Sequence, residues 1–280
     1  MPDGPPRYSA LQRALALALA LLLGASMPAA AGQPVSVELV LAVDVSVSVN
    51  DSEYALQMSG IANALRRPEV KRLITEQDEG VALTVMQWAG TATVEQVVPW
   101  RLLRTDADIE AMAHGIAVAP RAALSYYTAP AFGILGAMRL LERNGFDGAE
   151  RKIDVSGDGR RNTGPPASAA RTLAVAAGIT VNGLAIETDD ATLGDWYGRE
   201  VIGGPGAFVM RVSSFEGFGD AMARKLYREL SPKLSRLDRT RLNDQAGLAS
   251  ARSSSVSGMR HDIPRGVTTY SGHGKSTGGE

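Results

Sequence analysis

The chain has 280 residues, with 29 basic and 30 acidic side chains, three histidines and no cysteine. This length allows one large domain or two small ones and is enough to bury a core. The missing thiols exclude disulfide-stapled folds, cysteine-ligated zinc or iron–sulfur sites and a thiol nucleophile. A formal charge of −1 gives no general electrostatic reason to bind nucleic acid or an anionic membrane.

The first 31 residues have the order of a secretory signal peptide. Arg7 and Arg13 precede an unbroken apolar run at 14–23, and small residues at 29–31 follow as an Ala-x-Ala-like cleavage site. The apolar run is about ten residues long, whereas a membrane-spanning helix needs ~20. We therefore expect export to the periplasm or out of the cell, cleavage after Ala31, and no stable membrane insertion afterwards.

The segment 233–280 differs from the rest in composition. It carries eight basic and four acidic residues, is rich in serine and glycine, and has no apolar periodicity. Such a segment buries too little apolar surface to offset its ordering entropy, so we expect it to be mostly disordered. The predicted folded domain is then 32–232, which holds 19 basic and 25 acidic residues.

Strand-like and helix-like patterns alternate through the first half of this domain. The apolar run at 37–43 predicts a strand buried on both faces. Asn50 and Ser52 then offer N-cap chemistry for a helix over 53–66, which ends before a proline. A hairpin is predicted over 81–98, with its turn at Gly90. Helices are expected next, over 106–116 and 130–141.

The second half continues the alternation. We predict a short strand at 153–155, a helix at 165–177, strands at 180–186 and 207–212, and a closing helix at 215–230. Trp196 and Tyr197 suggest the apolar face of a further short helix. Alternating elements indicate an α/β fold: a doubly wound, mostly parallel sheet with one antiparallel edge strand and helices on both faces.

Oxygen-bearing side chains follow the first predicted strand. Asp44, Ser46 and Ser48 stand at alternate positions directly after the apolar run. In an open α/β sheet, ligands bind beyond the carboxyl ends of the strands. Oxygen donors suit a hard cation such as Mg²⁺. Aspartate and serine at a strand-to-helix turn are also common as caps and turn formers, which is the alternative interpretation.

Two further loops are expected at the same edge of the sheet. Thr128 precedes the predicted helix 130–141, so its hydroxyl is expected at the N-terminal end of that helix. Asp158 and Gly159 follow the predicted strand 153–155, which places a second carboxylate at the carboxyl edge. These two loops supply a second and a third set of oxygen ligands.

Asp44-x-Ser46-x-Ser48, Thr128 and Asp158-Gly159 together resemble the metal-ion-dependent adhesion site of the von Willebrand factor A domain, a Rossmann-like fold. The resemblance extends from about Val35 to Leu230. The run Ser156-Gly157-Asp158-Gly159 with Asn162, and the glycine-rich run 201–208, look like an uncharacterised branch of exported bacterial proteins with this domain.

The resemblance implies a binding module and not an enzyme. In it, Mg²⁺ (or Mn²⁺ or Ca²⁺) is held by Asp44, Ser46, Ser48, Thr128 and Asp158, and an acidic residue of a protein partner completes the metal shell. The loop before Thr128 lacks the glycine that is usual in the family. The resemblance also implies that ligand binding is coupled to displacement of the closing helix 215–230.

One alternative function and one local question stay open at this point. A Mg²⁺-dependent phosphoryl hydrolase would use Asp44 as its nucleophile, but Ser46 stands where such enzymes have a second aspartate, and no G-x-S-x-G motif occurs within the predicted domain 32–232. Asp154 lies in a strand predicted to be buried, where a carboxylate needs a partner. It pairs with Arg151 or Lys152, lies at a margin of the sheet, or orients the metal loops.

Overall fold

The computed structural model describes residues 32–231; the predicted signal peptide and the predicted tail lie outside the described residues. The described domain is built on a six-stranded sheet with the order β3-β2-β1-β4-β5-β6. Five strands are parallel, and only β3, at one edge, runs antiparallel to its neighbour β2. The predicted doubly wound sheet with one antiparallel edge strand is confirmed.

The strands and helices alternate along the chain. The strands are β1 (Gln33–Asp44), β2 (Val81–Trp88), β3 (Val94–Leu103), β4 (Phe146–Gly157), β5 (Ile179–Ile186) and β6 (Val209–Val212). The helices are α2 (Asp51–Arg66), α3 (Pro68–Thr75), α4 (Asp106–Ala117), α5 (Pro130–Glu142), α6 (Ala167–Ala176), α7 (Leu193–Glu200) and α8 (Phe218–Leu230), with a 3-10 turn at Phe215–Gly217 before α8. Within residues 32–231, no helix has the length and apolar character needed to cross a membrane.

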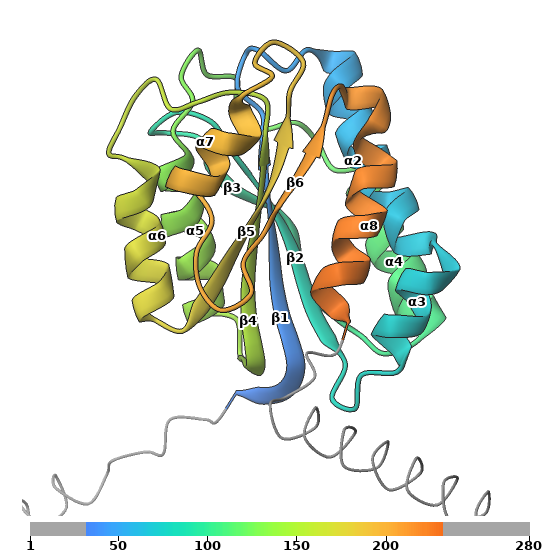
Figure 1. Ribbon diagram of the computed structural model, residues 1–280. Coiled ribbons are helices and arrows are strands. Elements are labelled where there is room, and N and C mark those ends of the chain that lie inside the picture. The colour runs from blue at the N-terminus through green and yellow to red at the C-terminus, as the bar shows by residue number, and fades with distance from the viewer. Residues whose placement is uncertain (1–31, 232–280) are drawn as a thin grey trace, which may run out of the picture. The chain divides into compact units, whose positions relative to one another are not determined.

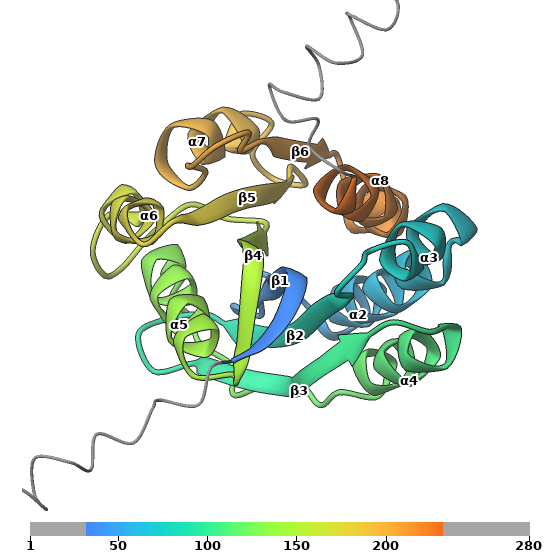
Figure 2. The same ribbon diagram turned by 90° about the horizontal axis from the view of Figure 1, so that it is seen from below.

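Helices cover both faces of the sheet. Helices α2, α3, α4 and α8 lie on one side, and α5, α6 and α7 lie on the other (Figures 1 and 2). Strand β1 supplies both cores, because successive side chains point to opposite faces. Leu39, Leu41 and Val43 belong to the core under α2, α4 and α8, while Val40 and Ala42 belong to the core under α5 and α6. This explains the continuous apolar run.

The start of α2 follows the predicted cap. The side chain of Asn50 accepts a hydrogen bond from the Glu53 backbone N–H at 3.0 Å, and the Glu53 carboxylate accepts one from the Asn50 N–H at 2.8 Å. This reciprocal pair satisfies two backbone donors that the helix itself cannot use. The loop between β1 and α2 is therefore fixed at its far end.

Three elements differ from the sequence prediction. Strand β3 continues past Pro99 to Leu103, with an irregular register against β2, whereas the predicted hairpin ends at 98. Pro68 ends α2 as expected, but it also begins the unpredicted helix α3, because Arg67 is extended and proline fits the first helical position. Strand β4 begins at Phe146 and not at Ile153. Its first half carries charged residues, so it has no apolar signal, and it is held in the sheet by pairing with β1.

A buried ionic network joins α8 to the central strands. The Lys225 ammonium lies 2.8 Å from Asp154 Oδ1 and 2.7 Å from Glu229 Oε1, and Asn182 donates to Glu229 Oε1 at 2.8 Å. All four side chains are almost completely buried. The cation that faces Asp154 thus comes from α8 and not from the two basic residues adjacent in sequence, Arg151 and Lys152.

We expect Lys225→Met to destabilise the domain by about 3–5 kcal/mol, because it leaves two buried carboxylates without their cation. The measurement is urea unfolding at neutral pH. Lys71→Met is the matched control: Lys71 pairs with Glu110 at 2.8 Å on the surface, where solvent weakens the interaction, so only a small loss is expected. Equal losses in the two variants would contradict a special role for the buried lysine.

The buried carboxyl of Asp154 also predicts a pH dependence. Burial raises the pKa of Asp154 from 3.8 to about 7, even though Lys225 acts to lower it. A raised pKa means that the folded state favours the protonated acid, so this contribution to stability is present below pH 4 and is lost as the pH rises through 7. Asp154→Asn should remove this dependence. The stability of the variant relative to the wild type should therefore increase as the pH rises from about 4 to 7. Parallel curves of unfolding free energy against pH would contradict the prediction.

Candidate metal centre

The five predicted ligands come from three loops at the carboxyl edge of the parallel strands. Val43 of β1 is paired with Ser156 of β4, so Asp44 and Gly157 end their strands at the same level. The loop after β1 and the loop after β4 therefore leave the sheet side by side. The loop between α4 and α5 joins them, because the Val47 N–H donates to the Ser125 carbonyl at 2.9 Å.

Four of the predicted residues form a continuous chain of contacts. Asp44 Oδ1 accepts a hydrogen bond from the Ser46 backbone N–H at 2.8 Å. The hydroxyl oxygens of Ser46 and Ser48 are 3.1 Å apart, and the Ser48 hydroxyl donates to Asp158 Oδ1 at 2.9 Å. Residues from two strands that are far apart in sequence thus converge on one small cluster of oxygen atoms.

Thr128 is held against the same cluster through the loop after β4. Its backbone N–H donates to Asn162 Oδ1 at 2.7 Å, and its carbonyl accepts from the Asn162 N–H at 3.0 Å. A β-carbon built on Gly159 would lie 3.8 Å from Thr128 Oγ1. The structure therefore brings Thr128 next to the loop that carries Asp158. Asn162 is the link, and in the sequence it stood out only as part of the family resemblance.

Arg121 braces the Asp44–Ser48 loop, a contact that no local sequence pattern predicts. Its guanidinium donates to the carbonyls of Val45 and Ser46 at 3.3 Å each, and also to that of Val49. It pairs with Asp51 at 2.8 Å as well. Several carbonyls that turn toward one cation hold the loop in a fixed conformation, which keeps the serine hydroxyls in place.

The electrostatics of the cluster disfavour two free carboxylates. The pKa of Asp44 is raised to about 8, mainly by burial and in addition by the charge of Asp158. Burial also raises the pKa of Asp158. Asp44 is completely buried, and its Oδ2 atom has no hydrogen-bond partner. A cation held by the cluster would remove the repulsion between the two acids.

The donor set fits a hard divalent cation. It consists of two carboxylates and three hydroxyl groups, all oxygen, which is the ligand chemistry of Mg²⁺, Mn²⁺ and Ca²⁺. No group of three or more His, Asp or Glu side chains suited to a metal is found in residues 32–231. The candidate centre therefore depends on hydroxyl ligands as well as on acids.

Gly157 and Tyr197 surround the inner side of Asp44. A β-carbon on Gly157 would lie 2.9 Å from Asp44 Oδ2 and 2.8 Å from the Tyr197 hydroxyl oxygen. Tyr197 of α7 is completely buried, and its hydroxyl, like Asp44 Oδ2, has no hydrogen-bond partner. Only glycine fits between these two oxygen atoms. The sequence showed Tyr197 as an apolar helix residue and gave no signal for this contact.

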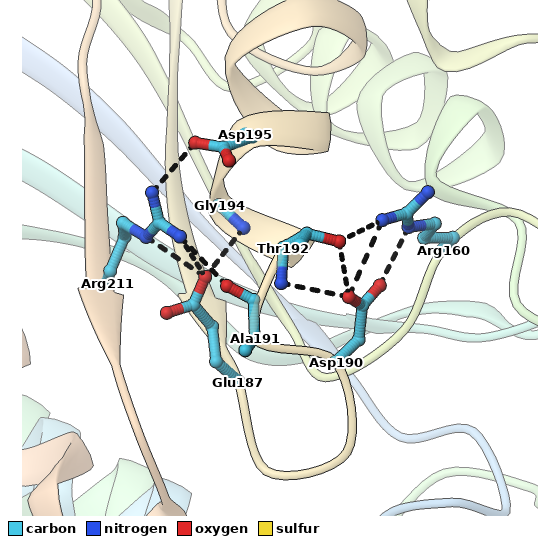
Figure 3. A network of polar contacts seen from close by, with 8 residues as sticks. All are labelled: Arg160, Glu187, Asp190, Ala191, Thr192, Gly194, Asp195 and Arg211. Carbon is cyan, nitrogen blue, oxygen red and sulfur yellow. Dashed lines mark hydrogen bonds and ion pairs between the residues drawn. The ribbon is translucent and has the colours of Figure 1, made fainter.

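The loop that carries Asp158 is also anchored to the loop before α7. Arg160 donates to Asp190 Oδ2 at 2.7 Å and to the Thr192 hydroxyl at 2.5 Å (Figure 3). Beside them, Arg211 of β6 pairs with Glu187 and Asp195 at 2.8 Å each. The Arg160 contacts hold the loop after β4 against the loop before α7, and the Arg211 contacts hold that second loop to β6.

Comparisons with known proteins agree with this geometry at the level of the fold. Residues 34–234 match a family model described as "Protein of unknown function (DUF1194)". A search among curated proteins finds no match.

Several solved structures are similar to the chain. Proximal thread matrix protein 1 (PTMP1) from the mussel byssus is 15% identical, with a TM-score of 0.51 over 71% of this chain and 47% of that chain. Another PTMP1 structure, with a zinc-occupied MIDAS motif, is 16% identical, with a TM-score of 0.52 over the same shares. The vWF domain of the pilus tip protein Mfa5 from Porphyromonas gingivalis is 10% identical, with a TM-score of 0.49 over 71% of this chain and 97% of that domain.

The chain therefore spans about half the length of PTMP1. At these identities the likeness shows the fold alone, and the fold is that of the von Willebrand factor A domain.

Gly157→Ala tests the position of Asp44. The added methyl group cannot fit between Asp44 and Tyr197, so the carboxylate must move. We expect the affinity for Mn²⁺, measured by isothermal titration calorimetry, to fall by about 10–100-fold. Gly198→Ala, on α7 with open space around its β-carbon, is the control and should bind as the wild type does. Unchanged Mn²⁺ affinity in a folded Gly157→Ala protein would remove Asp44 from the site.

Proposed function

We propose that this chain, which belongs to the DUF1194 family and has the von Willebrand factor A fold, is a metal-dependent protein-binding module of the adhesion type. The observation that carries the proposal is the contact chain from Asp44 through Ser46 and Ser48 to Asp158. With Thr128 beside it, this cluster offers five oxygen ligands at the sheet edge where ligands of α/β folds bind.

The composition of the cluster favours capture of an acidic group. Only two of the five groups, Asp44 and Asp158, are charged, while Ser46, Ser48 and Thr128 add ligands without adding charge. A bound Mg²⁺, Mn²⁺ or Ca²⁺ supplies a positive charge and an open coordination position for a carboxylate from a partner protein. Ser48 is exposed, so the cluster is accessible from solvent on that side.

The geometry gives less support to the hydrolase alternative. A nucleophilic Asp44 would have to reach a phosphorus atom, but this residue is completely buried. One oxygen of its carboxylate is occupied by the Ser46 N–H, and the other lies beside Gly157 in the interior. This geometry supports a role for Asp44 in holding a cation more than a role in attacking a substrate.

We also propose that the protein is exported. The arginines, the apolar run and the Ala-x-Ala-like site of residues 1–31 support this proposal. An adhesion-type module in the periplasm or outside the cell would meet its protein partner there. Amino-terminal sequencing of the protein recovered from the cell envelope tests the predicted cleavage after Ala31.

Ser48→Ala tests the metal site. Mg²⁺ that binds only the folded state raises the unfolding temperature, and the rise increases with its concentration above the dissociation constant. We expect this rise in the wild type and its loss in Ser48→Ala, measured by thermal unfolding with Mg²⁺ or with EDTA. Ser59→Ala, an exposed serine on α2, is the control and should keep the wild-type response. An undiminished rise in Ser48→Ala would contradict the assignment.

A pull-down tests partner binding. The purified chain is incubated with envelope extract of its own cell, with Mg²⁺ or with EDTA, next to Asp44→Ala and Ser48→Ala. We expect a captured protein only in the Mg²⁺ sample of the wild type. Capture that persists in both variants and in EDTA would mean that binding occurs elsewhere.

A further inference from the structure

Exposed apolar side chains gather beside the candidate metal centre. Nine large hydrophobic residues of the described chain are exposed. Four of them lie in the loops after β1 and before α5: Val47 (44% exposed), Leu124 (60%), Tyr126 (81%) and Tyr127 (58%). We call these four residues the apolar rim. Such clustering on one edge is typical of an interaction surface, whereas single exposed apolar residues need no explanation.

The apolar rim is continuous with the metal ligands along the chain. Val47 lies between Ser46 and Ser48, and Tyr127 directly precedes Thr128. The backbone bond from the Val47 N–H to the Ser125 carbonyl joins the two loops at 2.9 Å. A protein segment that places a side chain on the cation would therefore have the apolar rim beside it.

The backbone under the apolar rim is well anchored. The Tyr127 N–H donates to the Ser125 hydroxyl at 3.2 Å, and the Thr128 N–H donates to Asn162 at 2.7 Å. Gly90 packs closely against Ser125 and Tyr127, since a β-carbon there would lie 2.5 Å from the Ser125 hydroxyl oxygen. Aromatic side chains on a fixed backbone lose little entropy on binding, which makes them effective contact residues.

Charge differs between the two sides of the centre. Residues 45–49 and 122–128 contain no charged side chain, whereas the loop after β4 carries the exposed Arg160 and Arg161. Arg160 is paired with Asp190 (Figure 3). Arg161 is hydrogen-bonded to the Gly164 carbonyl at 2.9 Å and makes no ion pair with any residue of 32–231 closer than 4.0 Å. A complementary partner is thus acidic at the cation and apolar toward the tyrosines.

We infer that the partner is a protein segment in which the metal-binding aspartate or glutamate is flanked by an aromatic or aliphatic residue, and that this residue packs on the apolar rim. The inference rests on the proposed function, because the cation holds the acidic group. It adds a second contact, in which Tyr126 and Tyr127 select among acidic segments.

A peptide array tests the inference. Synthetic nonapeptides carry a central Asp in an alanine background, with Phe, Leu, Ser or Lys at each of the three positions on either side, and central Asn peptides serve as metal controls. Fluorescence polarisation measures binding of the full chain in Mg²⁺ and in EDTA. We expect Asp peptides with a flanking Phe or Leu to bind about tenfold more tightly than those with Ser, since one well-packed aromatic contact is worth about 1.4 kcal/mol.

The variant Tyr126→Ser/Tyr127→Ser should lose this preference while it keeps its affinity for Mn²⁺. Tyr227→Ser, an exposed tyrosine on α8, is the matched control and should keep the preference. The substitutions in both variants are at the surface, and thermal unfolding checks that the variants fold. Leu124→Ser provides an independent test of the apolar rim.

Each other outcome overturns one statement. Mg²⁺-dependent binding of Asp peptides without any preference at the flanks overturns the inference and leaves the proposed function intact. Absence of Mg²⁺-dependent binding by every Asp peptide overturns the proposed function. A third outcome concerns neutral glycans. If they bind the chain, if Tyr126→Ser/Tyr127→Ser loses this binding, and if the residues that flank the Asp make no difference to peptide binding, then the apolar rim binds sugars. The inferred protein contact is then wrong.

Discussion

Repulsion between a buried acid, Asp44, and a half-buried acid, Asp158, is the constraint on which the candidate site depends. Parallel pairing of β1 with β4 sets the ends of these strands level, so Asp44 and Asp158 leave the sheet side by side. Burial raises the pKa of both, and the charge of Asp158 acts on Asp44 as well. A divalent cation relieves this unfavourable electrostatic free energy. The parallel pairing that buries β1 on both faces therefore also brings together the two acids whose repulsion a cation relieves.

The loops around this cluster are held by groups that do not belong to it. Arg121 fixes the Asp44–Ser48 loop, Asn162 fixes Thr128, and Arg160 fixes the Asp158 loop. Each uses a different kind of hydrogen bond, and each connects a ligand loop to a different element. Because oxygen ligands must be positioned before a cation arrives, this bracing lowers the ordering cost of binding. The apolar rim shares the same anchored backbone.

Local signals explain what the sequence could predict. The apolar run of β1, the Asn50 cap and the proline at the start of α5 each act within a few residues, so the corresponding elements and the three ligand loops were predictable. The first half of β4 was not predictable, because its charged residues have no apolar pattern and are held in the sheet by pairing with β1. The contacts of Arg121 with the Asp44 loop, of Lys225 with Asp154 and of Tyr197 with Gly157 were also hidden. Each joins residues far apart in sequence, and nothing local marks such a pair.

The closing helix of this chain is tied to the sheet by charge as well as by apolar packing. Lys225 and Glu229 lie on α8, while Asp154 and Asn182 lie on β4 and β5. Any displacement of α8 along the sheet must separate these groups in a dry interior, where an unpaired charge is costly. Asp154 lies on β4, four residues before Asp158, which directly follows this strand. If metal-bound and metal-free states differ in the position of α8, as the family resemblance implies, the ionic network must re-form with new partners, and β4 is the shortest covalent connection between it and the metal loop.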